Sequence, residues 1–265
     1  MAAPTVSHAG TGATDAGGAW SYAGTVAGGT GLIHILQIVQ DGTTNGAVTF
    51  TGNANINDLA GAAGWTQITG PNGDGSWPIG SAESARQFLF IGRTTSGSAP
   101  SMSGGNSTSE DLYFRGYAFL NGSTGTTLAT VIENGSAGTA LNGAGTGTTI
   151  SDTGVTTLGT DRLALQFVAC NDDVAIDSFT GETGGDWTEF IAEYAEPSGT
   201  DASLQLQTAT MASAGTIDGG SDTIVSAGWG VVGFALIGTT AAGPATSMIY
   251  QPGRELAIPS SLYRR

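Results

Sequence analysis

A succession of short apolar segments, separated by turn-forming residues, is the feature that most constrains how this chain can fold. The segments are four to eleven residues long, and no pattern typical of a long amphipathic helix accompanies them. Asn-Gly pairs, whose residues tolerate the positive φ of tight turns, recur along the chain. We therefore expect an all-β fold, an antiparallel two-sheet sandwich of jelly-roll or concanavalin-like form. The eleven segments are residues 19–26, 31–40, 47–53, 65–68, 86–94, 111–120, 127–133, 162–170, 187–194, 203–212 and 228–238.

Two of these segments need closer inspection. For residues 31–40 the alternatives are a helix and a strand, and for residues 228–238 they are an edge strand and a central strand. Residues 31–40, GLIHILQIVQ, place apolar side chains at spacings that also fit a helical stripe, but glycine flanks, branched residues and short length favour a buried strand. Residues 228–238, GWGVVGFALIG, are apolar without interruption. That character predicts a central strand covered on both faces.

A tryptophan after glycine occurs twice in the same context. The order is an apolar strand, then GWTQI (64–68), then RQFLFIGRT in the first half, and an apolar strand, then GGDWTEFIAEY (184–194), then SLQLQTATM in the second. Each tryptophan could turn inward and close an open end of the sandwich, burying about 200 Å². A pseudo-duplicated sandwich and a chance recurrence both remain open as explanations.

Composition divides the chain into three parts. Residues 1–18 are small and polar without periodicity, which predicts a flexible N-terminal arm, and residues 19–240 form the sandwich domain. Residues 1–253 hold four arginines and 21 acidic residues (net −17), whereas 254–265 hold three arginines and one glutamate (net +2). We therefore expect residues 241–265 to be an extended docking tail. Its partner-binding side chains would be Met248, Ile249, Tyr250, Leu256, Ile258, Leu262 and Tyr263.

The overall charge excludes two classes of partner. A formal net charge of −15 and a pI near 4.1 argue against nucleic acid and against anionic membranes, which repel such a surface. The first residues lack the pattern of a signal peptide, and no apolar run reaches the roughly 20 residues that span a bilayer. We expect a chain made in the cytoplasm without an export signal. The single cysteine, Cys170, lies in an apolar run and is expected to be buried.

Groups that could carry a reaction are few, so we expect no enzymatic activity and no organic cofactor. His34 lies within a predicted strand, where a hydrogen-bonded core histidine is favoured over a catalytic base. No nucleophile elbow, phosphate-binding loop or zinc motif occurs. An acidic stretch offers oxygen ligands for Ca²⁺, although a solvated loop with turn-capping residues is the favoured alternative. The candidate ligands are Asn171, Asp172, Asp173 and Asp177.

Aromatic side chains suggest a second kind of site. Trp77, in GDGSWPIG, could anchor a loop or stack on a sugar, and the sequence does not separate these roles. Tyr113 and Tyr117 share one face of DLYFRGYAF with Arg115, where packing against a neighbouring sheet or subunit is favoured.

The strand succession quoted above, together with DLYFRGYAFLNGSTGTTLATVIENG and TTISDTGVTTLGTDRLALQFVA, resembles Gly/Ala/Thr-rich β-sandwich proteins of tailed bacterial and archaeal viruses over residues 20–238. The resemblance implies a virion structural or accessory protein, decorating the head or forming part of the tail. It implies a homo-oligomer in contact with other virion proteins, and carries no catalytic residue. A carbohydrate-binding module for host attachment and a glycan-active enzyme are the alternatives.

Overall fold

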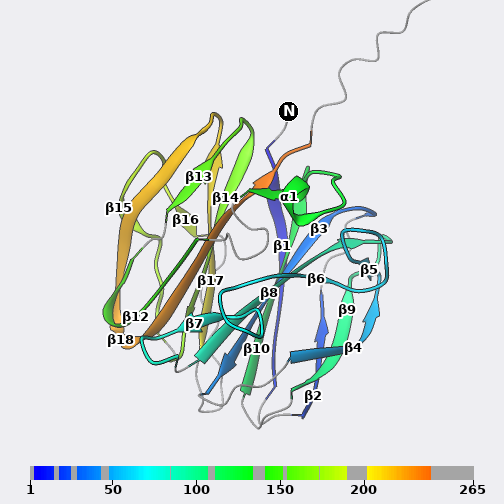
Figure 1. Ribbon diagram of the computed structural model, residues 1–265, viewed down its shortest axis with the longest axis horizontal. Helices are drawn as coiled ribbons and strands as arrows, with labels where there is room; N and C mark the ends of the chain where they lie inside the picture. Colours follow the sequence, from blue (N-terminus) through cyan, green and yellow to red (C-terminus); the bar gives the residue numbers. More distant parts are fainter. Residues whose placement is uncertain are drawn as a thin grey trace, which may run out of the picture.

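The computed structural model describes residues 3–14, 18–24, 29–42, 48–83, 85–106, 111–133, 141–151, 154–172, 174–189 and 202–239. In this part the protein is all-β, with antiparallel strands in three sheets and one short helix, α1 (Leu128–Val131) (Figure 1). The predicted all-β antiparallel fold is confirmed. No helix of the described part is long and apolar enough to cross a membrane.

Two large sheets make up most of the body. The seven-stranded one, here called the central sheet, has the order β1-β10-β3-β8-β5, with β6 and β7 also paired to β8. The eight-stranded one, the outer sheet, has the order β11-β18-β14-β17-β16, with β12, β13 and β15 paired to β18. The central strands are β1 (Thr5–Thr14), β3 (Ile33–Asp41), β5 (Ile56–Asn57), β6 (Thr66–Ile68), β7 (Trp77–Ile79), β8 (Ala85–Thr94) and β10 (Asp111–Leu120). The outer strands are β11 (Ile132–Glu133), β12 (Leu141–Ser151), β13 (Val155–Thr157), β14 (Arg162–Cys170), β15 (Thr180–Thr183), β16 (Thr188–Glu189), β17 (Ser203–Met211) and β18 (Gly215–Ile237).

A third, smaller sheet covers the other face of the central sheet. This small sheet has the order β2-β9-β4, formed by Gly18–Ala23, Ser101–Asn106 and Val48–Ala54. Alternate residues of β3 show the layering: Ile33 and Ile35 pack with the outer sheet, while Leu36 and Ile38 pack with aromatic residues of the small sheet. Both faces of β3 are therefore buried, which explains its nearly continuous apolar sequence. The third layer was not expected from the sequence.

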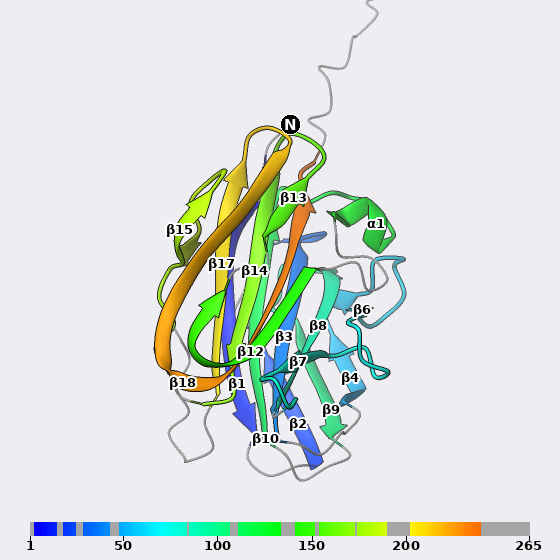
Figure 2. The ribbon, with the colours of Figure 1, turned by 60° about the vertical axis from the view of Figure 1, so that its left-hand side comes forward.

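Strand β18 gives the outer sheet its curvature. Its C-terminal half pairs with β14 and most of β12, as predicted for a central strand, and its N-terminal half pairs with β13, β15 and the end of β12. A register shift after Gly147, whose φ is +148°, marks the bend. Ile217 and Ile224 of the first half share an apolar cluster with Val168 of β14. Figure 2 shows the long strand descending, turning and rising again, so the sheet folds over its own outer face.

Two local predictions were wrong. Thr5–Thr14, within the expected flexible arm of residues 1–18, form strand β1 along the whole of β10. A ladder of backbone hydrogen bonds needs no apolar alternation, so the small residues of β1 gave no signal. Residues 127–133 were expected to be a strand but form α1 followed by the two-residue β11. The predicted docking tail, 241–265, lies outside the described residues.

The two large sheets share an order of strands. In the central sheet β10, β3, β8 and β6 are successive neighbours, and in the outer sheet β18, β14, β17 and β16 are successive neighbours in the same relative chain order. The pseudo-duplication interpretation predicts such a correspondence.

The sequence suggested that the recurring tryptophans turn inward and close the open ends of the sandwich, but neither ring does so. Trp65 packs on the small-sheet side of the central sheet, and Trp187 on the far side of the outer sheet. Gly64 and Gly184, with φ of +131° and +88°, reverse the chain shortly before each ring. The rings therefore cover the two opposite outward faces.

Candidate functional site

Buried polar side chains join the central and outer sheets. Gln37 Nε2 donates to Gln87 Oε1 at 2.5 Å and to the Val168 carbonyl oxygen at 3.1 Å, and the Tyr117 hydroxyl donates to Gln37 Oε1 at 2.9 Å. Gln87 Nε2 lies 3.4 Å from the Phe167 carbonyl oxygen. Burial raises the pKa of Tyr117, so the phenol remains a neutral donor. These groups fix the register of the two layers.

The predicted packing of the tyrosine face is confirmed. Tyr113 and Tyr117 are 2% and 0% exposed and lie in apolar clusters with the outer sheet. Arg115, between them, donates from Nη1 to the Leu204 carbonyl oxygen at 2.8 Å. Its charge therefore serves the contact between layers.

His34 is a core histidine, as predicted. It is fully buried between the central and small sheets, where Nε2 lies 3.4 Å from the Tyr22 hydroxyl oxygen and the ring centroid lies 5.5 Å from that of Trp65. Gly116 of the neighbouring strand leaves the room for this pair, since a Cβ there would overlap the Tyr22 hydroxyl and lie 2.7 Å from His34 Nε2. Cys170 is also buried, as expected.

The acidic stretch proposed for Ca²⁺ is tied to the outer sheet through its backbone and one amide. Asn171 Oδ1 accepts the Gly228 N–H at 2.7 Å, and the Asp177 N–H donates to Asp222 Oδ2 at 2.9 Å. Asp172 is exposed, and Asp173 lies outside the described residues. Within the described ranges, no three His, Cys, Asp or Glu side chains gather where they could hold a metal. Both contacts join residues far apart in the sequence, so they tie the stretch to β18 and are not the turn caps of the alternative interpretation.

A ladder of polar side chains on β17 holds this stretch in place. Ser203 Oγ donates to the Val174 carbonyl oxygen at 2.7 Å, Gln205 Nε2 to that of Ile176, and Gln207 Nε2 to that of Asp177 at 2.9 Å. All three β17 side chains are buried. The alternation SLQLQ at the start of β17 places these polar side chains on one face of the strand, but the pattern alone does not show what they bind.

Trp77 cannot stack on a sugar. It is 1% exposed, belongs to β7 and lies in the core cluster between the large sheets. The ring is accommodated by Gly70, where a Cβ would come within 2.7 Å of Trp77 Cδ2. The loop-anchor alternative therefore agrees with the structure, and the glycan assignment is wrong.

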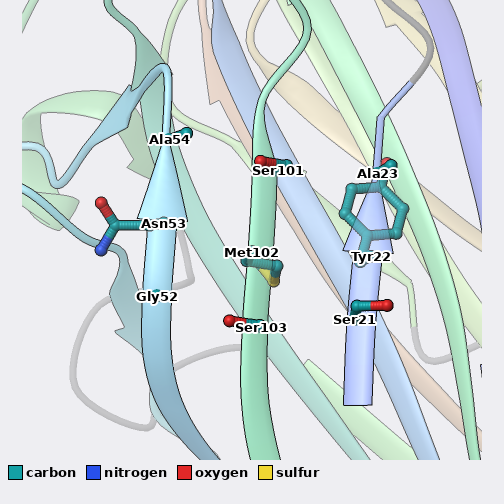
Figure 3. Close-up of a pocket in the computed structure, with 9 residues that line it drawn as sticks. All are labelled: Ser21, Tyr22, Ala23, Gly52, Asn53, Ala54, Ser101, Met102 and Ser103. Atoms are coloured by element: carbon teal, nitrogen blue, oxygen red, sulfur yellow. The ribbon is translucent and has the colours of Figure 1, made fainter.

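A shallow hollow lies on the small sheet, over β4, β9 and β2 (Figure 3). Its volume is about 370 Å³. The strands alternate, so that Tyr22 and Met102 are buried against the central sheet while Ser21, Ser101 and Ser103 are at least partly exposed. Gly52 keeps the hollow open, since a Cβ there would lie 2.8 Å from Ser103 Oγ. Hydroxyl groups without an acid or base suit contact with another surface better than chemistry.

A second hollow, of about 320 Å³, contains the ion pairs of Arg86. Nη1 binds Asp74 Oδ2 at 2.7 Å and Nη2 binds Glu83 Oε2 at 2.9 Å. Burial acts to raise the pKa of Asp74, but hydrogen bonds from Ser76 and the charge of Arg86 outweigh it and hold that pKa below its usual value. Each charge is already matched within the chain, so this hollow is structural.

Comparisons of the chain with protein-family models, with curated proteins and with solved structures gave no match. The seven predicted tail residues, from Met248 to Tyr263, lie outside the described residues.

Proposed function

We propose that this protein is a non-enzymatic structural or accessory protein of a virus particle, on the head surface or in the tail of a tailed virus. It associates with copies of itself and with other virion proteins through its sheet faces and residues 241–265. The supporting observation is that the buried polar side chains bind the sheets to one another and line no reactive site among the described residues. Gln37, Gln87 and Arg115 hold layers together, and the hollow on the small sheet carries hydroxyl groups rather than an acid–base pair. Such a body is a rigid scaffold with surfaces for contact.

The charge distribution supports association through the C-terminal segment. Residues 1–253 carry a net charge of −17 and residues 254–265 a net charge of +2, so the segment is attracted to the body of any copy. Burial of five or six of its large side chains would contribute on the order of ten kcal/mol before ordering entropy is subtracted. Repetition over several copies multiplies a contact of that size.

The carbohydrate-binding alternative depended on an exposed Trp77, and this residue is buried. Trp77 is enclosed by the core, and both tyrosines of β10 are buried as well. Among the described residues, the hollow of Figure 3 is lined by small polar and apolar side chains, with the Tyr22 ring buried behind it. Sugar recognition by stacking on an exposed ring is not favoured there.

The solution mass of the full chain, beside a truncation that ends at Gly243, tests the proposal. We expect light scattering after size exclusion to show a defined oligomer for the full chain and a smaller species for the truncation. A full-length variant with Leu256→Ser and Ile258→Ser keeps length and charge, and should dissociate as the truncation does if apolar contact drives assembly. Monomers from both the full chain and the truncation would contradict self-association through this segment.

A further inference from the structure

Arg93 is a half-buried cation whose partners are neutral. It lies near the end of β8, and its Nη2 donates to the carbonyl oxygens of Ser123 and Gly125 at 2.6 and 2.7 Å, while Nη1 lies 3.4 Å from that of Gly31. Burial lowers the pKa of Arg93 below its usual value. Among the described residues, the guanidinium is therefore held by the dipoles of carbonyl groups.

This arrangement differs from that of two other arginines of the body. Arg86 and Arg162 each bind a carboxylate at 2.7 Å. No acidic residue of the described ranges forms an ion pair with Arg93. In a chain with 22 acidic and seven basic residues, a half-buried arginine that forms no ion pair with the described residues is unexpected. A carboxylate supplied from elsewhere would give Arg93 the kind of partner that Arg86 and Arg162 have, whereas the buried Arg115 donates to the Leu204 carbonyl oxygen.

Arg93 lines a pocket of about 290 Å³ that such a carboxylate could enter. Leu59 and Ala60 form part of its apolar lining, and Thr124 and Thr126 add exposed threonines. Asp58 also lines the pocket, but its Oδ1 accepts the Ala62 N–H at 2.8 Å within its own turn. The pocket thus combines the Arg93 cation and the Asp58 carboxylate, which form no ion pair with each other, with apolar and hydroxyl contacts.

The chain passes beside this pocket as it leaves the body. Thr239, the last described residue, donates its N–H to the Asn121 carbonyl oxygen at 2.8 Å, and Gly238 forms a β-bridge with Gly122. The segment from Asn121 continues into the pocket wall at Thr124 and then into α1, which lies near the end of β18 (Figure 1). Residues 240–265 therefore begin next to the pocket.

We propose that Glu255 binds Arg93 in this pocket and thereby docks the C-terminal segment on the body. Glu255 is the only acidic residue of 240–265, and Leu256 follows it. The guanidinium and the carboxylate would form a charge-assisted pair, with apolar side chains of the segment against Leu59 and Ala60. Fifteen residues lie between Thr239 and Glu255, a span of about 50 Å when extended, so the same copy or a neighbour can supply the carboxylate. The inference names the receiving site and rests on the proposed function, in which this segment is a docking segment.

Disulfide trapping in the full chain tests this site. Thr126→Cys is combined with Ala257→Cys, which leaves Glu255 intact, and the native Cys170 is buried and does not compete. The matched control combines Thr126→Cys with Ser247→Cys, a position closer in sequence to Thr239. We expect the 126–257 pair to oxidise at least about tenfold faster than the 126–247 pair, because docking raises the effective concentration of one thiol at the other. A freely moving segment would link position 247 at least as fast.

The role of the carboxylate is tested by adding Glu255→Gln to the 126–257 pair. This change lies outside the described body, and the rate should fall to that of the control pair. An unchanged rate, or equal rates for positions 257 and 247, would overturn the assignment.

The trapped species also separates this inference from the proposed function. An oxidised monomer means that the segment docks on its own body, whereas a linked dimer means exchange between copies, and either outcome supports the site. An oligomer that yields no 126–257 link leaves the assembly role standing and refutes the Arg93 site. A monomer by light scattering that traps efficiently refutes self-association and supports the site.

Discussion

Replacement of Trp77 by alanine separates a structural role from a ligand-binding role. The ring is 1% exposed and lies in the apolar cluster that joins the two large sheets. Its strand, β7, is followed by Gly80, whose N–H donates to the Trp229 carbonyl oxygen of β18 at 3.0 Å. Trp→Ala in a core removes apolar contacts and leaves a cavity, and costs about 3–5 kcal/mol. At about 2–4 °C per kcal/mol for a domain of this size, Tm should fall by roughly 10 °C.

The matched variants make the magnitude interpretable. Among the described residues the indole N–H of Trp77 has no hydrogen-bond partner, so Trp77→Phe loses no hydrogen bond and should cost less than half as much. Trp65→Ala removes a half-buried ring and should cost about 1–2 kcal/mol, because less apolar surface becomes exposed. Urea unfolding followed by far-ultraviolet circular dichroism avoids the loss of tryptophan fluorescence. A change below about 1 kcal/mol in Trp77→Ala would refute the core role, since a buried ring cannot be removed so cheaply.

Two further substitutions test the interior and the ion pairs. Gly116→Ala should lower the free energy of unfolding by about 1–3 kcal/mol, because the added Cβ would overlap the Tyr22 hydroxyl. Tyr22→Phe in the same chain should recover part of this loss, measured by urea unfolding. An unchanged unfolding midpoint in Gly116→Ala would contradict the packing. Asp74→Asn should destabilise the protein near neutral pH. The pKa of Asp74 is lowered in the folded state, so its contribution is present above the unfolded value of about 3.9 and is lost as pH falls through the folded pKa. Thermal unfolding from pH 7 to pH 2 should show the two proteins converging, and a constant difference would contradict this origin.

The interior strands were predictable because a strand that is buried on both faces carries apolar side chains at nearly every position. Segments 31–40 and 228–238 are apolar at nearly every position, which is the pattern of strands covered on both faces, and both are central strands. The tyrosine face of β10 was predicted for the same reason, since large side chains on one face of a strand must pack on something. The sequence could not show that the covering layer of the central sheet is a separate small sheet, because β9 is Ser-Met-Ser-Gly-Gly-Asn and offers one apolar residue.

Other features depend on contacts that only the fold creates. Trp77 follows Gly-Asp-Gly-Ser and precedes proline, which is the pattern of a loop, and its burial requires the distant Gly70 beneath the ring. Arg93 lies near the end of a strand whose apolar residues are easily recognised, but its carbonyl partners can be seen only when the 121–127 segment lies beside it. Asn171 was placed among candidate metal ligands by composition, and the structure shows its oxygen accepting the Gly228 N–H instead.

The distribution of polar groups limits how this protein can recognise others. Glutamine, tyrosine and arginine side chains are drawn into the seams between layers, where they bind carbonyl oxygens and each other. Of the three hollows described, the one on the small sheet is lined by hydroxyl groups, the second holds the ion pairs of Arg86, and the third holds Arg93 with its carbonyl partners. Shallow hydroxyl-lined surfaces give shape and hydrogen bonds but little binding energy, because apolar burial supplies most of it. If the protein assembles as proposed, the binding energy would come from the apolar side chains of residues 240–265, and the charge of Arg93 would determine where that segment binds.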